Sequence, residues 1–104
     1  KSDDDTRTWY YDRTSIRRDA GHAWMWNMTN YNEMQQWEGH NFWSSVAQFE
    51  YDCSNRQARV TVENGFSDRM GKGQITYTVQ GPRAWRDMDP GTIGEARWKI
   101  ACNR

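Results

Sequence analysis

The chain has 104 residues, a length typical of one domain with a modest core. Its 14 basic and 14 acidic residues balance to a net charge of zero, so it lacks the basic excess that nonspecific nucleic-acid binding requires. No apolar run approaches about 18 residues, which excludes a transmembrane helix.

Residues 1–8 are polar and include three consecutive aspartates. We expect them to form a disordered or extended tail, and residues 9–104 to form a single domain. Because the polar start has no signal-peptide pattern, an exported protein would be present in its mature form.

The domain is rich in residues that favour strands. It contains seven Trp and no Leu, and its apolar residues are mostly aromatic or β-branched. Alternating apolar and polar residues predict strands at 9–15, 22–31, 43–53, 58–66 and 74–80, with a short sixth strand at 85–88. Residues 17–21, 54–57 and 67–73 are predicted turns, and the polar segment 32–41 is predicted to be a loop.

The second predicted strand has apolar side chains on both faces. Trp24, Trp26 and Met28 alternate with Ala23 and Met25. The pattern indicates a strand that is central in the sheet or covered on both sides. We expect four tryptophans in regular elements to be core residues: Trp24, Trp26, Trp43 and Trp98.

The end of the chain changes to a helical pattern. Asp89-Pro90-Gly91 is a stop signal, and Thr92 and Glu95 have the spacing of a capping box, in which each side chain accepts a hydrogen bond from the other residue's backbone N–H. Ile93 and Ile100 then lie on one helical face. These signals predict a helix over 93–102.

Two cysteines, Cys53 and Cys102, stand 49 positions apart at the ends of a predicted strand and of this helix. They lack the paired Cys/His spacing of a zinc site, so a disulfide is the simpler interpretation and implies an oxidising compartment. The predicted fold is therefore α+β: an antiparallel sheet of about five to six strands with one C-terminal helix packed on it and tethered by the disulfide.

No residue group in the sequence predicts catalysis or metal binding. Cys53 could act as a nucleophile only with a base such as His22 or His40, and a disulfide would consume its thiol. The two histidines are far apart and have no Asp or Glu at metal-ligand spacing. We therefore expect no enzyme, no metal and no cofactor.

Aromatic residues outside the core are the candidates for binding. Exposed Trp side chains are good interface anchors because they bury a large area at low entropic cost. Trp37 and its loop could form a contact surface or a dimer seam, or could fold back over a sheet edge. The candidate contact residues are Trp37, Trp9, Trp85, Arg17 and Arg18.

Several segments together resemble the surface-adhesin protein E family of Gram-negative bacteria. They are Tyr11-Asp12-Arg13-Thr14-Ser15-Ile16, Ala23-Trp24-Met25-Trp26, Phe49-Glu50-Tyr51-Asp52-Cys53, Met70-Gly71-Lys72-Gly73, Trp85 leading to Asp89-Pro90-Gly91-Thr92-Ile93-Gly94-Glu95, and Trp98-Lys99-Ile100-Ala101-Cys102. The match extends from about residue 9 to residue 102, and it rests on the order of the segments more than on any one of them.

The resemblance implies an exported protein of the periplasm or outer-membrane surface, with a helix disulfide-tethered to an antiparallel sheet. It implies a noncatalytic, adhesin-like binding module with a protein partner, and it allows a homodimer. The family's named member engages host matrix proteins such as vitronectin and laminin. The alternatives are an envelope-accessory domain without a host ligand and a binder of a small hydrophobic ligand such as haem, held between helix and sheet.

Overall fold

The computed structural model describes residues 2–3 and 6–104. Its elements in chain order are β1 (Ser2–Asp3), β2 (Arg7–Asp19), β3 (His22–Trp37), β4 (His40–Asp52), β5 (Gln57–Phe66), the 3-10 turn η1 (Arg69–Gly71), β6 (Ile75–Gln80), β7 (Arg86–Asp87) and α1 (Ile93–Cys102).

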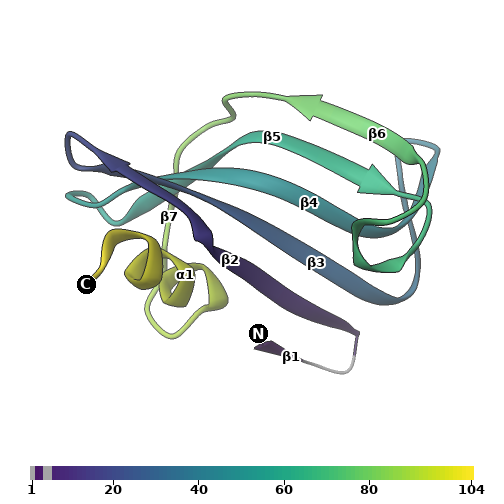
Figure 1. The fold of residues 1–104 in the computed structure, drawn as a ribbon, viewed down its shortest axis with the longest axis horizontal. Coiled ribbons are helices and arrows are strands. Elements are labelled where there is room, and N and C mark those ends of the chain that lie inside the picture. Colours follow the sequence, from purple (N-terminus) through teal and green to yellow (C-terminus); the bar gives the residue numbers. More distant parts are fainter. Residues whose placement is uncertain (1, 4–5) are drawn as a thin grey trace.

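The strands form one antiparallel sheet in sequence order, β1-β2-β3-β4-β5-β6. The short strand β7 pairs with the first two residues of β5, Gln57 and Ala58. Figure 1 shows α1 lying against the end of the sheet that carries the β2–β3 and β4–β5 turns, and leaving the opposite end of the sheet uncovered by helix. The predicted fold class is confirmed, and β3 is a central strand, as its two apolar faces indicated.

The predicted loop over residues 32–41 is wrong. β3 continues to Trp37 and β4 begins at His40, with these two residues paired across a two-residue turn. Glu38 and Gly39 form that turn, both with positive φ (47° and 81°), which is the backbone that tight hairpins need. A long hairpin therefore replaces the loop.

The first strand is also longer than predicted and carries a bulge. β2 begins at Arg7 and continues to Asp19, so the turn expected at 17–21 shrinks to Ala20 and Gly21, both with positive φ. Between the pairs Asp12↔Trp26 and Arg17↔Trp24, four residues of β2 (13–16) lie opposite a single residue of β3, Met25. The extra residues bend the strand where α1 packs. Of the expected tail, Ser2–Asp3 pairs with β2, and residues 1, 4 and 5 lie outside the described residues.

The helix has the predicted bounds. Thr92 is its N-cap, and the Thr92 hydroxyl accepts a hydrogen bond from the Glu95 N–H at 3.1 Å. The reciprocal half of the capping box is absent, because the Glu95 carboxylate accepts from the Gly91 N–H and pairs with Arg56 at 2.9 Å. Asn103 ends the helix in the left-handed conformation, with φ of 57°.

The predicted disulfide joins Cys53, just after β4, to Cys102 in the last turn of α1. Beside it the Trp98 indole N–H donates to the Asp52 carbonyl at 2.8 Å, so the same end of β4 holds the helix twice. The core between helix and sheet comprises Ala23, Met25, Tyr51, Ala58, Trp98, Ala101 and Cys102.

The expected tryptophan core is largely wrong. Of the four tryptophans placed there, all within the described residues, Trp98 is buried, whereas Trp24, Trp26 and Trp43 are half-buried. The helix covers the face of β3 that carries Ala23 and Met25, and so Trp24 and Trp26 point to the other face.

Candidate functional site

Five aromatic side chains form a continuous row at the end of the sheet that the helix leaves uncovered. The Tyr31 ring lies 5.6 Å from Phe42, Phe42 lies 5.1 Å from Tyr77, and Tyr77 lies 5.1 Å from Trp37, as measured between ring centroids. These side chains come from β3, β4 and β6, which neighbouring hairpins bring together. We call this set, with Trp9, the aromatic row.

Arg7 joins Trp9 to the row. Its guanidinium carbon lies 5.7 Å from the Trp9 ring centroid and 5.2 Å from that of Tyr31, within the range of cation–π attraction. Arg7 is the cross-strand partner of Tyr31, and Trp9, two residues along β2, shares their face of the sheet. The aromatic row thus spans strands β2, β3, β4 and β6.

Four members of the row, Tyr31, Trp37, Phe42 and Tyr77, line a shallow hollow of about 250 Å3, and two charged side chains, Glu63 and Arg83, line it with them. The Tyr77 hydroxyl donates to Glu63 at 2.6 Å. Burial raises the pKa of Tyr77, and Glu63 raises it further, since a tyrosinate there would face a carboxylate. Burial also raises the pKa of Tyr31. Both phenols therefore stay neutral and offer polar contacts, not nucleophiles.

The side chains of the row differ in exposure, from buried residues in its middle, which we call its base, to an exposed residue at one end. Phe42 and Tyr77 are buried, Trp9 and Tyr31 are half-buried, and Trp37 at the hairpin tip is 38% exposed. Tyr77 packs directly over Gly65, where an added Cβ would lie only 2.0 Å from the ring. The base is consequently fixed by the sheet backbone, while Trp37 offers a large aromatic surface to a partner.

Trp85 lies on the other face of the sheet, apart from the row. Its ring is 4.3 Å from the Arg59 guanidinium carbon and 5.8 Å from the His22 ring. Glu50 bridges this cluster: its carboxylate lies 2.8 Å from Arg59 Nη2 and 2.8 Å from His22 Nδ1. Since Glu50 is 8% exposed, these contacts compensate a buried charge.

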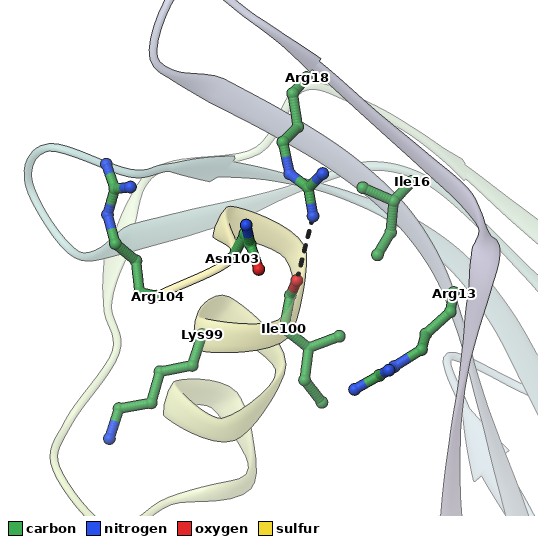
Figure 2. A pocket seen from close by; sticks show the side chains of 7 residues that line it. All are labelled: Arg13, Ile16, Arg18, Lys99, Ile100, Asn103 and Arg104. Atoms are coloured by element: carbon green, nitrogen blue, oxygen red, sulfur yellow. Dashed lines mark hydrogen bonds between the residues drawn. The ribbon is translucent and has the colours of Figure 1, made fainter.

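The two candidate arginines separate as well. Arg18 reaches the end of α1, where its Nε donates to the Ala101 carbonyl at 2.8 Å. Its Nη2 donates to the Ile100 carbonyl at 3.5 Å, the bond drawn as a dashed line in Figure 2. Arg17 pairs with Trp24, is exposed, and faces the opposite side of the strand. Of the five predicted contact residues, Trp9 and Trp37 belong to the aromatic row, at opposite ends of its chain of contacts.

No catalytic or metal-binding arrangement is seen among the described residues. His22 and His40 lie at opposite ends of the β3–β4 hairpin, and the Cys53 sulfur is bonded to Cys102. The described part of the chain has no cluster of three His, Cys, Asp or Glu side chains that could hold a metal ion, and no helix long and apolar enough to span a membrane. The gap between α1 and the sheet, considered above for a hydrophobic ligand, is filled by core side chains including Trp98 and Met25.

Sequence reasoning missed most of the row. Tyr31, Phe42 and Tyr77 each lay in or beside predicted strands, but the loop assigned to residues 32–41 hid the hairpin that aligns them. A search for sequence motifs could not find these three residues, because they lie on separate strands and share no local sequence pattern. Their signal is cross-strand pairing, which appears only once the register is known.

The comparisons with known proteins agree with this architecture. The family model described as surface-adhesin protein E matches residues 1–103 of the chain. The chain belongs to the surface-adhesin protein E family. Membership implies an exported, envelope-associated protein that binds other proteins. No curated protein matches the chain significantly.

Solved structures of the family member from Haemophilus influenzae share the fold. One, Haemophilus influenzae protein E in its crystal form II, has a TM-score of 0.72 and 15% sequence identity, covering 91% of this chain and 80% of that one. A second, protein E from non-typeable Haemophilus influenzae, has a TM-score of 0.70 and 16% identity, covering 91% and 69%. At this identity the likeness establishes the surface-adhesin fold, whereas contact residues must be argued from this chain itself.

Proposed function

We propose that this chain is a noncatalytic binding module of the bacterial envelope whose contact surface is the aromatic row. The observation that supports this best is continuity: Trp9 and Trp37, from two different hairpins, are linked by ring contacts and by Arg7 into one surface. Tyr, Trp and Arg are the side chains that most often dominate binding energy at protein interfaces.

The row combines a rigid base with an exposed anchor. Phe42 and Tyr77 cannot shift without disturbing the sheet, whereas Trp37 presents the area that a partner would bury. Glu63 and Arg83 add one charge of each sign at the border, where polar contacts set orientation and exclude wrong partners. Such a surface binds a folded protein and needs no bound cofactor.

Family membership supports a host extracellular-matrix protein, such as vitronectin or laminin, as the partner, and the periplasm or outer-membrane surface as the location. A second copy of this chain is the other partner that the exposed Trp37 edge would accept, which gives a homodimer. An envelope-accessory role without a host ligand remains the competing function.

The test is binding of the oxidised protein to immobilised vitronectin and laminin, comparing wild type with Trp37→Ala. We expect saturable binding that weakens by about 30-fold, which corresponds to about 2 kcal/mol for a hot-spot tryptophan. Trp85→Ala is the matched control, since Trp85 lies on the other face, and it should bind as wild type does.

Sedimentation of the same variants separates the two partners. If Trp37→Ala abolishes self-association and leaves matrix binding intact, the row is a dimer seam. If wild type binds neither matrix protein and stays monomeric, the aromatic row is not a contact surface and the envelope-accessory role replaces the proposal.

A further inference from the structure

The two edges of the sheet differ in how they are protected from further strand pairing. At the β2 edge, the short strand β1 pairs with Thr8 and Trp9, and the bulge over residues 13–16 interrupts the rest of the strand. At the other edge, no strand in the described part of the chain pairs with the outer side of β6 (Figure 1). The six residues of β6 include no charged side chain and no proline, the devices by which edge strands usually avoid pairing with other chains. The outer side of β6 is therefore an open pairing edge.

The register between β5 and β6 shows which backbone groups point to this edge. The Gly81 N–H donates to the Thr61 carbonyl at 2.8 Å, and the register continues without a shift from that bond to the pair Gly65↔Tyr77. Bonded and unbonded pairs alternate between antiparallel strands, so Tyr77 bonds to β5 while Thr78 and Gln80 direct their N–H and C=O groups outward. Both residues are exposed, which leaves these four groups accessible to a partner's backbone.

The open edge borders the hollow of the aromatic row. Tyr77 and Val79, which alternate with the outward-bonding residues along β6, line that hollow together with Trp37. A strand added beside β6 would place every second side chain over the hollow, because side chains alternate between the faces of a sheet. Ile75, at the start of β6, is 56% exposed, so a further apolar side chain at this edge is open to a partner.

The charges in the hollow define the chemistry of such a strand. The Glu63 carboxylate already accepts a hydrogen bond from the Tyr77 hydroxyl, whereas Arg83 has no carboxylate within salt-bridge distance among the residues that the structure describes. The Arg83 N–H donates to the Val60 carbonyl at 2.9 Å, which fixes its backbone just past the end of β6. An added strand would therefore meet aromatic rings beside Tyr77 and an unpaired guanidinium beyond Val79.

We propose that the protein partner of the aromatic row binds through an extended segment that adds a strand to β6. The inference rests on the function proposed above and specifies the form of the partner. Backbone groups of Thr78 and Gln80 supply the hydrogen bonds, and the side chains that line the hollow select the sequence. Antiparallel addition continues the pattern of this sheet, so the segment carries at every second position, from its N-terminus, an acidic, a β-branched and an aromatic residue. The acidic residue then lies near Arg83.

The probe is the blocked heptapeptide Ser-Asp-Thr-Val-Thr-Phe-Ser, added to the oxidised protein and followed by NMR. In the antiparallel register its valine lies opposite Val79, and its two threonines lie opposite Thr78 and Gln80. We expect saturable shifts of the Thr78 and Gln80 amides and an Hα–Hα NOE between Val79 and the peptide valine, since this pair would be close and not hydrogen-bonded.

Methylated peptides test the backbone contacts directly. N-methylation of both peptide threonines removes the N–H groups that face β6, and it should weaken binding about 30-fold for the loss of two hydrogen bonds. N-methylation of the peptide valine is the matched control, because its N–H faces away from β6, and it should leave the affinity unchanged.

Variants of the protein test the same geometry from the other side. Thr78→Pro removes the outward N–H and should abolish peptide binding, whereas Thr78→Ala should bind as wild type does, although both variants lose the side-chain hydrogen bond to Asn64. Arg83→Gln should weaken binding about threefold, as expected for one exposed ion pair, and should not change the binding of a peptide with asparagine in place of aspartate. If Thr78→Pro does not fold, the methylated peptides decide.

The outcomes separate this inference from the function proposed above. Strand addition is overturned if the peptide does not bind at millimolar concentration, if both methylated peptides bind as the parent does, or if β6 pairs with β6 of a second copy instead. Matrix-protein binding that Trp37→Ala weakens and Thr78→Pro leaves intact would keep the aromatic row as the contact surface and reject strand addition. Peptide binding with the expected NOE, in a protein that binds neither matrix protein, would support strand addition and reject those two partners.

Discussion

Removing the disulfide should destabilise the fold without changing it. The bond between Cys53 and Cys102 spans 49 positions, and the chain-entropy relation gives about 4 kcal/mol for closing a loop of that length. A domain of this size has a free energy of unfolding of about 5–15 kcal/mol, so the loss is a large part of the total. With an m-value of about 2 kcal/mol/M, the urea midpoint of Cys53→Ala/Cys102→Ala should fall by about 2 M.

The assay is urea unfolding followed by the total tryptophan fluorescence and by far-ultraviolet circular dichroism, with reduced wild type as the matched control. We expect the reduced protein and the double alanine variant to unfold at the same midpoint, because both lose the same constraint on the unfolded chain. The helix should stay docked in water, since the Trp98 and Arg18 hydrogen bonds to Asp52 and Ala101 survive. A midpoint shift below about 0.5 M, or a loss of helix signal in water, would refute the entropic reasoning.

Three further predictions concern other sites. Burial raises the pKa of Tyr51 from 10.0 to about 12, so the Tyr51 hydroxyl loses its proton at lower pH in the unfolded chain than in the folded one. The free energy of unfolding should therefore be constant below pH 10.0 and fall by up to about 3 kcal/mol as the pH rises to about 12. In urea unfolding at a series of pH values, Tyr51→Phe should show a smaller fall. Gly65→Ala should force the Tyr77 ring aside, lower the free energy of unfolding by about 1–3 kcal/mol and weaken partner binding, and unchanged calorimetry would contradict the packing. Glu50→Gln leaves Arg59 without its buried carboxylate and should lower thermal stability by an amount equivalent to about 2 kcal/mol, whereas equal melting temperatures would show that the pair contributes nothing.

Sequence reasoning predicted the fold because the elements near the helix carry strong local signals. Thr92 sets the start of α1, and the alternation along β4 and β5 predicts the hairpin that these two strands form. The tip of the β3–β4 hairpin carries no such signal. Side chains there are exposed on both faces, so alternation is lost, and Glu38-Gly39 is a weaker turn signal than Asn-Gly.

Which tryptophans are buried could not be predicted, because burial depends on where the helix docks. Trp24 and Met25 are neighbours on one strand, and composition favours either as core. The helix covers Met25, so Trp24 remains half-buried. The same holds for the candidate site. Trp9 and Trp37 could each be named from the sequence, but the contacts through Tyr31 and Phe42 that link them depend on the register of the strands.

The order of the strands has a consequence for synthesis. Neighbours from β2 to β6 are consecutive in the chain, so each pairing forms as soon as its hairpin has been made, and such sequence-local contacts assemble quickly. The cover for the apolar face is the last element: Arg18 reaches Ala101, and Arg97 reaches Tyr10, across more than 80 positions. In a chain synthesised from its N-terminus, the sheet can therefore form while Met25 and Tyr51 are still exposed to solvent. These side chains become buried when the ten-residue helix α1 packs on them.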